Sequence, residues 1–419
     1  MPITILALLP HYLPGYKAGG PVRSVENIVE QLGEPFTFKI VTRDRDAGDR
    51  IAFPGVTPGH WHQVGKGRAI YLTHSPLGAL AMRRVIRDAG HDVLYLNSLF
   101  SPTFTLVPLL LRRLRLIPRH AVVLAPRGEL HPGALDTGEW PGWVPARLVR
   151  GLPSPRKLKK LAYIAVTRAL RLFRGITWQA SNEEEAGQIR RFLGRRVTVV
   201  VAPDLVKAPP AAPATPRPKA AGTLRVAYVS RIDSKKNLLG TLAVLDGVKG
   251  DVGLDIYGPV DDPRYWARCQ AAIERLPPNV SARYHGPVPH EWVGEVFRSH
   301  DLFLFPTWGE NFGHVVLEAL VQGCPVLASD RTPWRGLAAH HAGWDLPPDD
   351  VAGMRAVVQA CVDMAPAAYR ALSRSAAAYG RACSLDQQPV DSTRELFYAA
   401  SGNPAAQGGA QRPARRALG

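Results

Sequence analysis

Short β-branched runs alternate with longer amphipathic stretches along most of this chain, and this alternation restricts the fold more than any other feature. In the first half, the runs occupy residues 3–9, 36–42, 93–97, 121–125, 175–180 and 197–201. Strands that alternate with helices form parallel sheets whose faces are covered by the helices. The sequence therefore predicts an α/β fold that begins with a β-strand.

The alternation stops between residues 207 and 222, where Ala, Pro and Lys dominate, and then starts again. Further strands are expected at 224–230, 253–257, 282–285, 302–305 and 325–328, with a helix at 240–248. Because 419 residues exceed one ordinary core, we expect two parallel-sheet domains. The predicted division is 1–206 for the first domain, 207–222 for an exposed linker, 223–383 for the second domain and 401–419 for a disordered tail.

Composition excludes several classes of protein. The longest apolar run, residues 104–111, contains Pro108 and is much shorter than the roughly 20 residues of a membrane-spanning helix. The four cysteines show neither paired spacing nor the spacing of metal ligands, which argues against a disulfide framework or a zinc site. We therefore expect a cytoplasmic protein.

The formal net charge of +17 is concentrated in the first half, where residues 101–200 contain 18 Lys and Arg against 6 Asp and Glu. Anionic lipid and nucleic acid both attract such a surface. Lys157, Lys159 and Lys160 belong to a basic amphipathic stretch suited to lipid phosphate, and a solvated helix face is the alternative. No nucleic-acid-binding module is recognisable, so we expect a membrane surface rather than nucleic acid.

Candidate ligand-binding residues follow two strands of the second domain. The first strand runs into residues 231–237, where Arg231 and Lys236 could neutralise a diphosphate at the carboxyl edge of the sheet. Strand 302–305 leads into a helix whose first amides favour an anion or a hydroxyl. Glu310 and Glu318 flank that helix start, and carboxylates accept paired hydrogen bonds from sugar diols. The alternatives are a solvated basic loop and two ordinary surface carboxylates.

Together these segments resemble the retaining glycosyltransferases of the GT-B class, family four, also called group 1. The resemblance rests on residues 230–237, Tyr257-Gly258-Pro259, Tyr284-His285-Gly286, 307–318 and 323–330. It implies a GT-B fold, in which two Rossmann-like parallel-sheet domains face a central cleft. It also implies a hexosyltransferase-like activity on a nucleotide-sugar donor, and a crossover helix for which 384–400 is the candidate.

The resemblance implies a role for each matched residue. Its donor-binding residues are Arg231, Lys236, Gly258, His285, Gly286, Glu310, Asn311, Phe312, Gly313 and Glu318. Arg231 and Lys236 would bind the diphosphate, and Glu318 would bind the ribose. Glu310 would lie near the transferred sugar and count among the catalytic residues. For the base slot at 257–259 and 284–286, ordinary strand-turn chemistry is the alternative.

Two segments of the first domain also resemble this family. In residues 14–21, Gly19 and Gly20 would border the diphosphate and the acceptor, and a plain turn is the alternative. Residues 125–135 resemble a motif of polysaccharide-assembling members. There Arg127, Glu129 and His131 are candidates for acceptor contact or proton transfer, although such members often carry a small hydroxyl residue in place of His131.

No metal or other cofactor is expected, because the basic loop supplies the positive charge that the diphosphate needs. The rival interpretation is that Asp44-Arg45-Asp46 binds a divalent cation. The expected acceptor is a saccharide linked to polyprenyl diphosphate, at the inner face of the plasma membrane, in exopolysaccharide, O-antigen or capsule assembly. An epimerase-like GT-B enzyme and a nucleic-acid-binding protein are the alternative functions.

Overall fold

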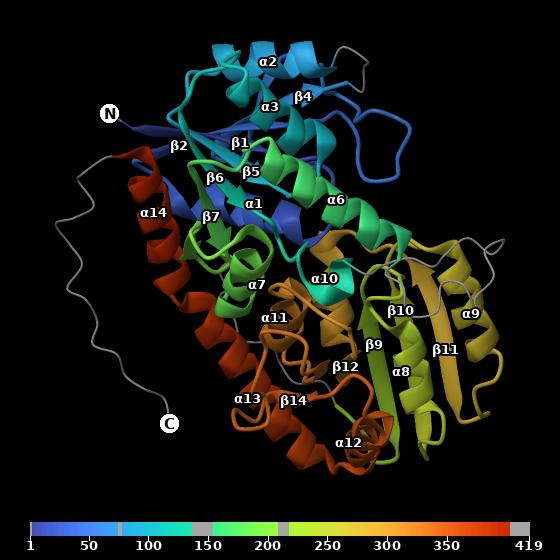
Figure 1. Ribbon diagram of the computed structural model, residues 1–419. Coiled ribbons are helices and arrows are strands. Elements are labelled where there is room, and N and C mark those ends of the chain that lie inside the picture. Colours follow the sequence, from blue (N-terminus) through green and yellow to red (C-terminus); the bar gives the residue numbers. More distant parts are fainter. Residues whose placement is uncertain (1, 74–77, 136–153, 208–217, 403–419) are drawn as a thin grey trace.

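The chain folds into two α/β domains that lie against each other (Figure 1). The computed structural model describes residues 2–73, 78–135, 154–207 and 218–402. Most of the expected linker and tail, 208–217 and 403–419, lies outside the described residues. The prediction of two parallel-sheet domains is confirmed.

The N-terminal domain contains an eight-stranded sheet in the order β3-β4-β2-β1-β5-β6-β7-β8. Its strands are β1 (Ile3–Leu8), β2 (Phe36–Arg43), β3 (Trp61–Val64), β4 (Gly67–Leu72), β5 (Val93–Asn97), β6 (Ala121–Ala125), β7 (Ile176–Ala180) and β8 (Thr198–Val201). The helices are α1 (Gly20–Leu32), α2 (Gly78–Asp88), α3 (Val107–Arg113), α4 (Pro132–Leu135), α6 (Pro155–Ala169) and α7 (Glu183–Leu193), with a π-helical turn at Pro102–Leu106. All neighbouring strands are parallel except β3 and β4.

The C-terminal domain contains a six-stranded parallel sheet in the order β11-β10-β9-β12-β13-β14. Its strands are β9 (Thr223–Val229), β10 (Asp251–Tyr257), β11 (Val280–Gly286), β12 (Leu302–Phe305), β13 (Val326–Ser329) and β14 (Gly343–Leu346). The helices are α8 (Leu238–Leu245), α9 (Pro263–Ile273), α10 (His290–Arg298), α11 (His314–Val321), α12 (Val351–Asp363), α13 (Pro366–Leu385) and α14 (Gln388–Ser401).

Three strands were not expected from the sequence. β3 and β4 form an antiparallel hairpin through Gly65, which adopts a φ of 57° that suits glycine. β14 pairs with β13 at the edge of the second sheet, and its sequence GWDL contains no β-branched residue. Since strand preference depends strongly on pairing and burial, short segments of this kind form strands only once a neighbour is in place.

The final helix joins the two domains. α13 packs on α11 in the C-terminal domain, whereas α14 contacts α1, β5 and β6 in the N-terminal domain (Figure 1). Phe397 of α14 is fully buried, and its ring lies 5.2 Å from that of Tyr95. The segment at 384–400 thus leaves one core and enters the other. Within the described residues, no helix is both long and apolar enough to cross a membrane.

Candidate active site

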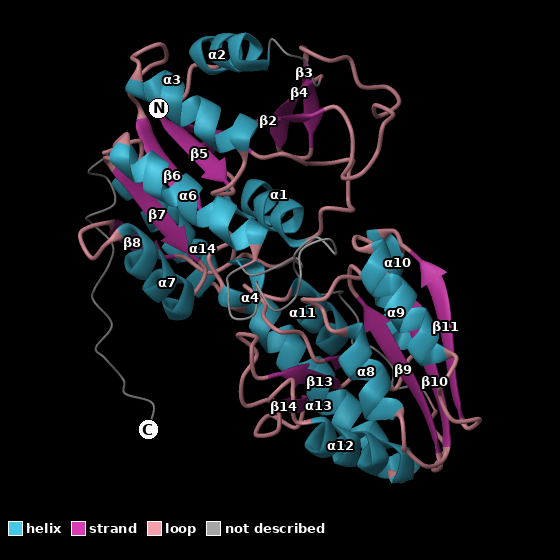
Figure 2. Cartoon of the chain, turned by 45° about the vertical axis from the view of Figure 1, so that its right-hand side comes forward, coloured by secondary structure: helices cyan, strands magenta, loops and turns pink. Residues whose placement is uncertain are grey.

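A cavity of about 1210 Å³ lies between the two domains. Its walls are the loops that follow the strands of both sheets, which Figure 2 shows facing each other across the molecule. Ligands of open α/β sheets bind at this carboxyl edge, outside the strand ends. The cavity is therefore the candidate active site.

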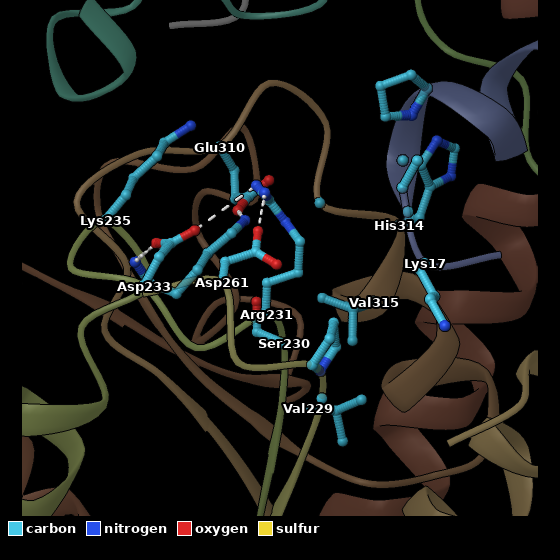
Figure 3. Close-up of a pocket in the computed structure, with 18 of the residues that line it drawn as sticks. Lys17, Val229, Ser230, Arg231, Asp233, Lys235, Asp261, Glu310, His314 and Val315 are labelled. Carbon is cyan, nitrogen blue, oxygen red and sulfur yellow. Dashed lines mark hydrogen bonds and ion pairs between the residues drawn. The ribbon is translucent and has the colours of Figure 1, made fainter. Parts of the chain in front are cut away.

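Arg231 enters the cavity from the end of β9 (Figure 3). Gly258 makes this geometry possible: its φ is 142°, and a Cβ atom there would lie 1.9 Å from the carbonyl oxygen of Ser230. The guanidinium of Arg231 donates to Asp261 at 2.6 Å and lies 3.7 Å from Asp233. Because its side chain is still 43% exposed, Arg231 can also reach a ligand.

Lys236 and Glu310 form an ion pair at the centre of this wall, with side chains that are 11% and 13% exposed. Burial alone raises the pKa of Glu310, but the cations Lys236, Lys235 and Arg231 outweigh that effect and leave the pKa below its usual value. Burial also lowers the pKa of Lys235 to about 8, against the opposing effect of Glu310. Three cations thus lie around the ionised Glu310, with Asp233 and Asp261 beside Arg231, so an anion that binds here would replace carboxylate partners of these cations.

The start of α11 supplies backbone donors to the same wall. Gly313 caps the helix with a left-handed φ of 78°, and Asn311, Phe312 and Gly313 all line the cavity. The carbonyl of Phe312 accepts a hydrogen bond from the indole of Trp334 at 2.7 Å, which fixes the loop. Amides at a helix N-terminus attract negative charge, so this loop and the three cations favour the same kind of ligand.

Glu318 lies further along α11, beside His290 at 3.6 Å. Burial raises the pKa of Glu318 to about 7, although Arg23 opposes the shift. Burial also lowers the pKa of His290 to about 4, with Arg23 and other cations adding to the effect. The imidazole is therefore neutral near pH 7, while the carboxyl of Glu318 is close to its titration midpoint.

The loop that contains Gly19 and Gly20 borders the cavity on the N-terminal side. Gly19 adopts a φ of 69°, and a Cβ atom on Gly20 would lie 3.9 Å from the ring of His314 across the cleft. The carboxylate of Asp46 holds the loop by accepting hydrogen bonds from the backbone amides of Tyr16 and Lys17 at 2.8 and 3.1 Å.

Both carboxylates of the Asp44-Arg45-Asp46 segment have partners within the N-terminal domain. Asp44 accepts a hydrogen bond from the neighbouring Arg45 at 2.8 Å, and Asp46 accepts hydrogen bonds from the loop amides. Within the part of the chain that the structure describes, no cluster of three His, Cys, Asp or Glu is arranged for a metal ion.

Arg127 and Glu129 line the cavity, but their charged groups face the interior of the N-terminal domain. Arg127 donates to Asp204, to the Tyr95 hydroxyl and to Asn97, and its side chain is only 5% exposed. Glu129 accepts hydrogen bonds from the Ser98 hydroxyl and the Leu99 amide. Both residues thus hold loops of the N-terminal wall in place.

Three predicted site residues do not line the cavity. His131 lies at the domain interface, where a Cβ atom on Gly309 would come within 2.3 Å of its ring. His285 stacks on Tyr257 with ring centroids 4.7 Å apart, and its Nε2 lies 2.6 Å from Asp255. Gly286 ends β11 beside it. The structure therefore brings the predicted diphosphate and sugar residues together but leaves these three outside.

Several residues on the cavity wall were not predicted as site residues. Among them are Arg23, Lys235, His290 and His314. Lys235 is next to the predicted Lys236, and His314 is next to the predicted Gly313. The motifs that contain these predicted residues could therefore have indicated Lys235 and His314 as well. Arg23 follows Gly20 by three residues, which places it on the first turn of α1. For His290 the sequence contains no comparable signal, because α10 approaches α11 only in the folded domain.

Comparisons with known proteins agree with this arrangement. Residues 216–373 match the family described as Glycosyl transferases group 1. No curated protein matches the chain. Among solved structures, sucrose-phosphate synthase from Thermosynechococcus elongatus is similar over 95% of this chain and 100% of its own, with 19% identity and a TM-score of 0.67.

Two further structures extend the likeness. Anabaena HepE in complex with UDP and glucose matches over 96% of this chain and 100% of its own, with 15% identity and a TM-score of 0.62. An alpha,alpha-trehalose-phosphate synthase (UDP-forming) from Burkholderia xenovorans matches over 95% and 100%, with 11% identity and a TM-score of 0.64. The GT-B fold is confirmed, and the matched C-terminal domain identifies the enzyme class as glycosyltransferase.

Proposed function

We propose that this enzyme is a retaining glycosyltransferase of family four that moves a hexose from a nucleotide sugar to a saccharide carried on polyprenyl diphosphate. The products would be exopolysaccharide, O-antigen or capsule precursors. The observation that carries the proposal is the cluster of Arg231, Lys235 and Lys236 around Glu310, beside the amides of α11. Cations that surround a carboxylate beside helix-start amides support binding of a diphosphate that is attached to a sugar.

In the proposed reaction, the bond between the anomeric carbon and the oxygen of the donor diphosphate breaks, and the oxygen of an acceptor hydroxyl bonds to that carbon on the same face. In the front-face form of this step, the hydroxyl proton passes to the departing diphosphate. Negative charge grows on the leaving diphosphate, where Arg231, Lys235 and Lys236 stabilise it more strongly than in the bound substrate. Glu310 faces the developing positive charge of the sugar. Front-face attack and double displacement both fit these residues, and no metal or other cofactor is part of the proposal.

The rest of the donor would extend along the C-terminal wall. Glu318 accepts hydrogen bonds from the ribose hydroxyls in this proposal, and the base lies near Tyr257, Gly258 and Pro259. UDP is the first nucleotide to test, because HepE was solved with UDP and glucose and the Burkholderia synthase is described as UDP-forming.

The acceptor would approach from the N-terminal wall. Arg156 and Lys160 of α6 line the cavity together with Arg23, so this side also carries positive charge. That charge suits the phosphates of a lipid-linked acceptor. The proposed location is cytoplasmic, peripheral on the inner face of the plasma membrane, with no nucleic-acid partner.

Calorimetric titration with UDP, GDP and ADP, repeated in EDTA, tests the donor site. One nucleotide should bind to wild type without metal, and Arg231→Ala should weaken it by about tenfold or more, because a charge-assisted phosphate contact is lost. Arg298→Ala is the matched control, since Arg298 lies on α10 of the same domain, is 50% exposed and does not line the cavity. Absence of binding to wild type, or equal loss in both variants, would contradict the proposed donor site.

A further inference from the structure

A second, smaller cavity of about 440 Å³ lies on the N-terminal domain, away from the cleft. Its lining consists of five arginines and two leucines: Arg112, Arg113, Arg119, Arg171, Arg174, Leu109 and Leu172. The arginines come from the end of α3, the residues before β6 and the turn between α6 and β7. Three chain segments therefore bring one kind of side chain to one cavity.

The cavity lies at the opposite edge of the sheet from the candidate active site. Arg119 precedes β6 and Arg174 precedes β7, whereas Arg127 follows β6 and lines the large cavity. Since β6 has five residues, the two edges are about 17 Å apart along the strand. An occupant of the arginine cavity would therefore be distinct from the donor nucleotide.

The arginines of this cavity lack the counter-charges found elsewhere in the molecule. Within the described residues, none of the five forms an ion pair with a carboxylate, and no acidic residue lines the cavity. Among the residues that the structure describes, Arg112 donates only to the carbonyl of Arg174, at 3.2 Å, and no partner lies at its buried Nε atom. Burial lowers the pKa of Arg112, and nearby Arg119 adds to the shift. Collecting like charges in this way costs stability unless an anion binds there.

We propose that the arginine cavity binds the phosphate group of a ligand, and that the ligand is the headgroup of an anionic lipid. Guanidinium groups match phosphate oxygens with paired hydrogen bonds, and five of them line this one cavity. The apolar base formed by Leu109 and Leu172 limits the space left for water around the phosphate.

Exposed apolar side chains near the cavity favour a lipid over a free phosphate. Leu114 and Leu116 follow Arg113 with exposures of 64% and 40%, and Leu170 precedes Arg171 with an exposure of 49%. Along α6, Leu158 and Val166 are also exposed, at 45% and 56%, with exposed Ala162 between them at helical spacing. Apolar side chains beside basic ones are typical of helices that lie at a lipid surface.

α6 also connects the arginine cavity with the candidate active site. Arg156 and Lys160, near its start, line the large cavity, and Arg171, just beyond its end, lines the small one. A helix of 15 residues is about 22 Å long. A headgroup bound at one end would therefore place the lipid surface along α6, with the cleft at the other end. This inference does not depend on the identity of the donor.

Vesicle sedimentation tests the proposal with the full chain, using phosphatidylcholine vesicles with and without phosphatidylglycerol at about 0.15 M salt. Wild type should bind only the vesicles that contain phosphatidylglycerol. Reversing two exposed cavity charges, with Arg113→Glu and Arg171→Glu together, should weaken binding by about 30-fold or more. The matched control is Arg195→Glu with Arg196→Glu, two exposed arginines of the same domain that line neither cavity. The control should lose much less affinity.

A second experiment distinguishes a lipid phosphate from a free phosphate as the ligand of the arginine cavity. Inorganic diphosphate is titrated into wild type and both double variants in the Arg231→Ala background with saturating UDP, so that the proposed donor site does not contribute, and Leu114→Ser with Leu116→Ser is tested in both assays. If the leucine variant loses vesicle binding but keeps diphosphate binding, the phosphate comes from a lipid. If diphosphate binds through the arginines and vesicles do not, the cavity takes a free phosphorylated molecule, and the lipid assignment is wrong.

Two results would overturn the phosphate site itself. One is equal loss of vesicle binding in the cavity variant and in the Arg195, Arg196 control, which would reflect bulk charge alone. The other is binding of neither probe to wild type. Nucleotide titration in the same variants shows that they are folded, and it separates this proposal from the proposed function because the donor site lies in the other domain.

Discussion

The two walls of the large cavity both carry charged pairs, but the pairs differ in how deeply they are buried. Arg231 and Asp261 on the C-terminal wall have exposures of 43% and 39%. Arg127 and Asp204 on the N-terminal wall have exposures of 5% and 3%. An exposed pair exchanges its partner at little cost, whereas breaking a buried pair leaves an uncompensated charge. The Arg231–Asp261 pair can therefore exchange its carboxylate for a ligand, whereas the Arg127–Asp204 pair holds the loops of its own wall.

The largest expected effect is on stability, from Arg127→Ala. Removing this guanidinium leaves the buried Asp204 without its cation, and the free energy of unfolding should fall by about 3–5 kcal/mol. Chemical denaturation followed by circular dichroism measures the change. Arg231→Ala, on the other wall, should change it by less than about 1 kcal/mol because that pair is exposed. A variant of Arg127 that is as stable as wild type but inactive would assign Arg127 a catalytic role.

The next effect is on catalysis, from Glu310→Gln. The turnover number should fall by about 10²–10³-fold, as when a preorganised group near the reacting atoms is removed. Affinity for the nucleoside diphosphate should stay the same or rise, because Lys236 loses its competing carboxylate. Initial rates and calorimetry measure the two quantities separately, with Glu295→Gln on the surface of α10 as the control. Parallel loss of both would mean that Glu310 only shapes the donor site.

The C-terminal wall could be predicted in large part from the sequence because its residues follow their strands closely. Arg231 comes two residues after β9, and Gly313 directly precedes α11. In a parallel sheet, the carboxyl ends of β9 and β12 lie at the same edge, so the loops that follow these two strands lie close together. The pairing of Lys236 with Glu310 is the contact that results.

The N-terminal wall was harder to predict, because its side chains are positioned by distant segments. The sequence of residues 125–135 does not show that Arg127 faces Asp204, which is 77 positions away. Nor does it show that Gly309 approaches the ring of His131 across the domain interface. The arginine cavity likewise combines residues before β6 with others before β7, so only the net basic charge of this region could be recognised beforehand.

The smallest expected effect is on the pH dependence of donor binding. Affinity should rise and then fall with pH, and the groups responsible for both changes lie on the C-terminal wall. The pKa of Glu318 is raised to about 7, so its carboxyl gains charge and accepting capacity as pH rises through that value, and nucleotide affinity should increase. The pKa of Lys235 is lowered to about 8, so its positive charge is lost above that value and affinity should decrease.

Calorimetry across this range should thus give a maximum between the two pKa values, with a change of about tenfold or less on each side. Glu318→Gln should remove only the acidic limb and Lys235→Arg only the basic limb, since each replacement no longer titrates there. If a limb persists in its own variant, the titrating group lies elsewhere, and the division between a binding wall and a supporting wall would have to be redrawn.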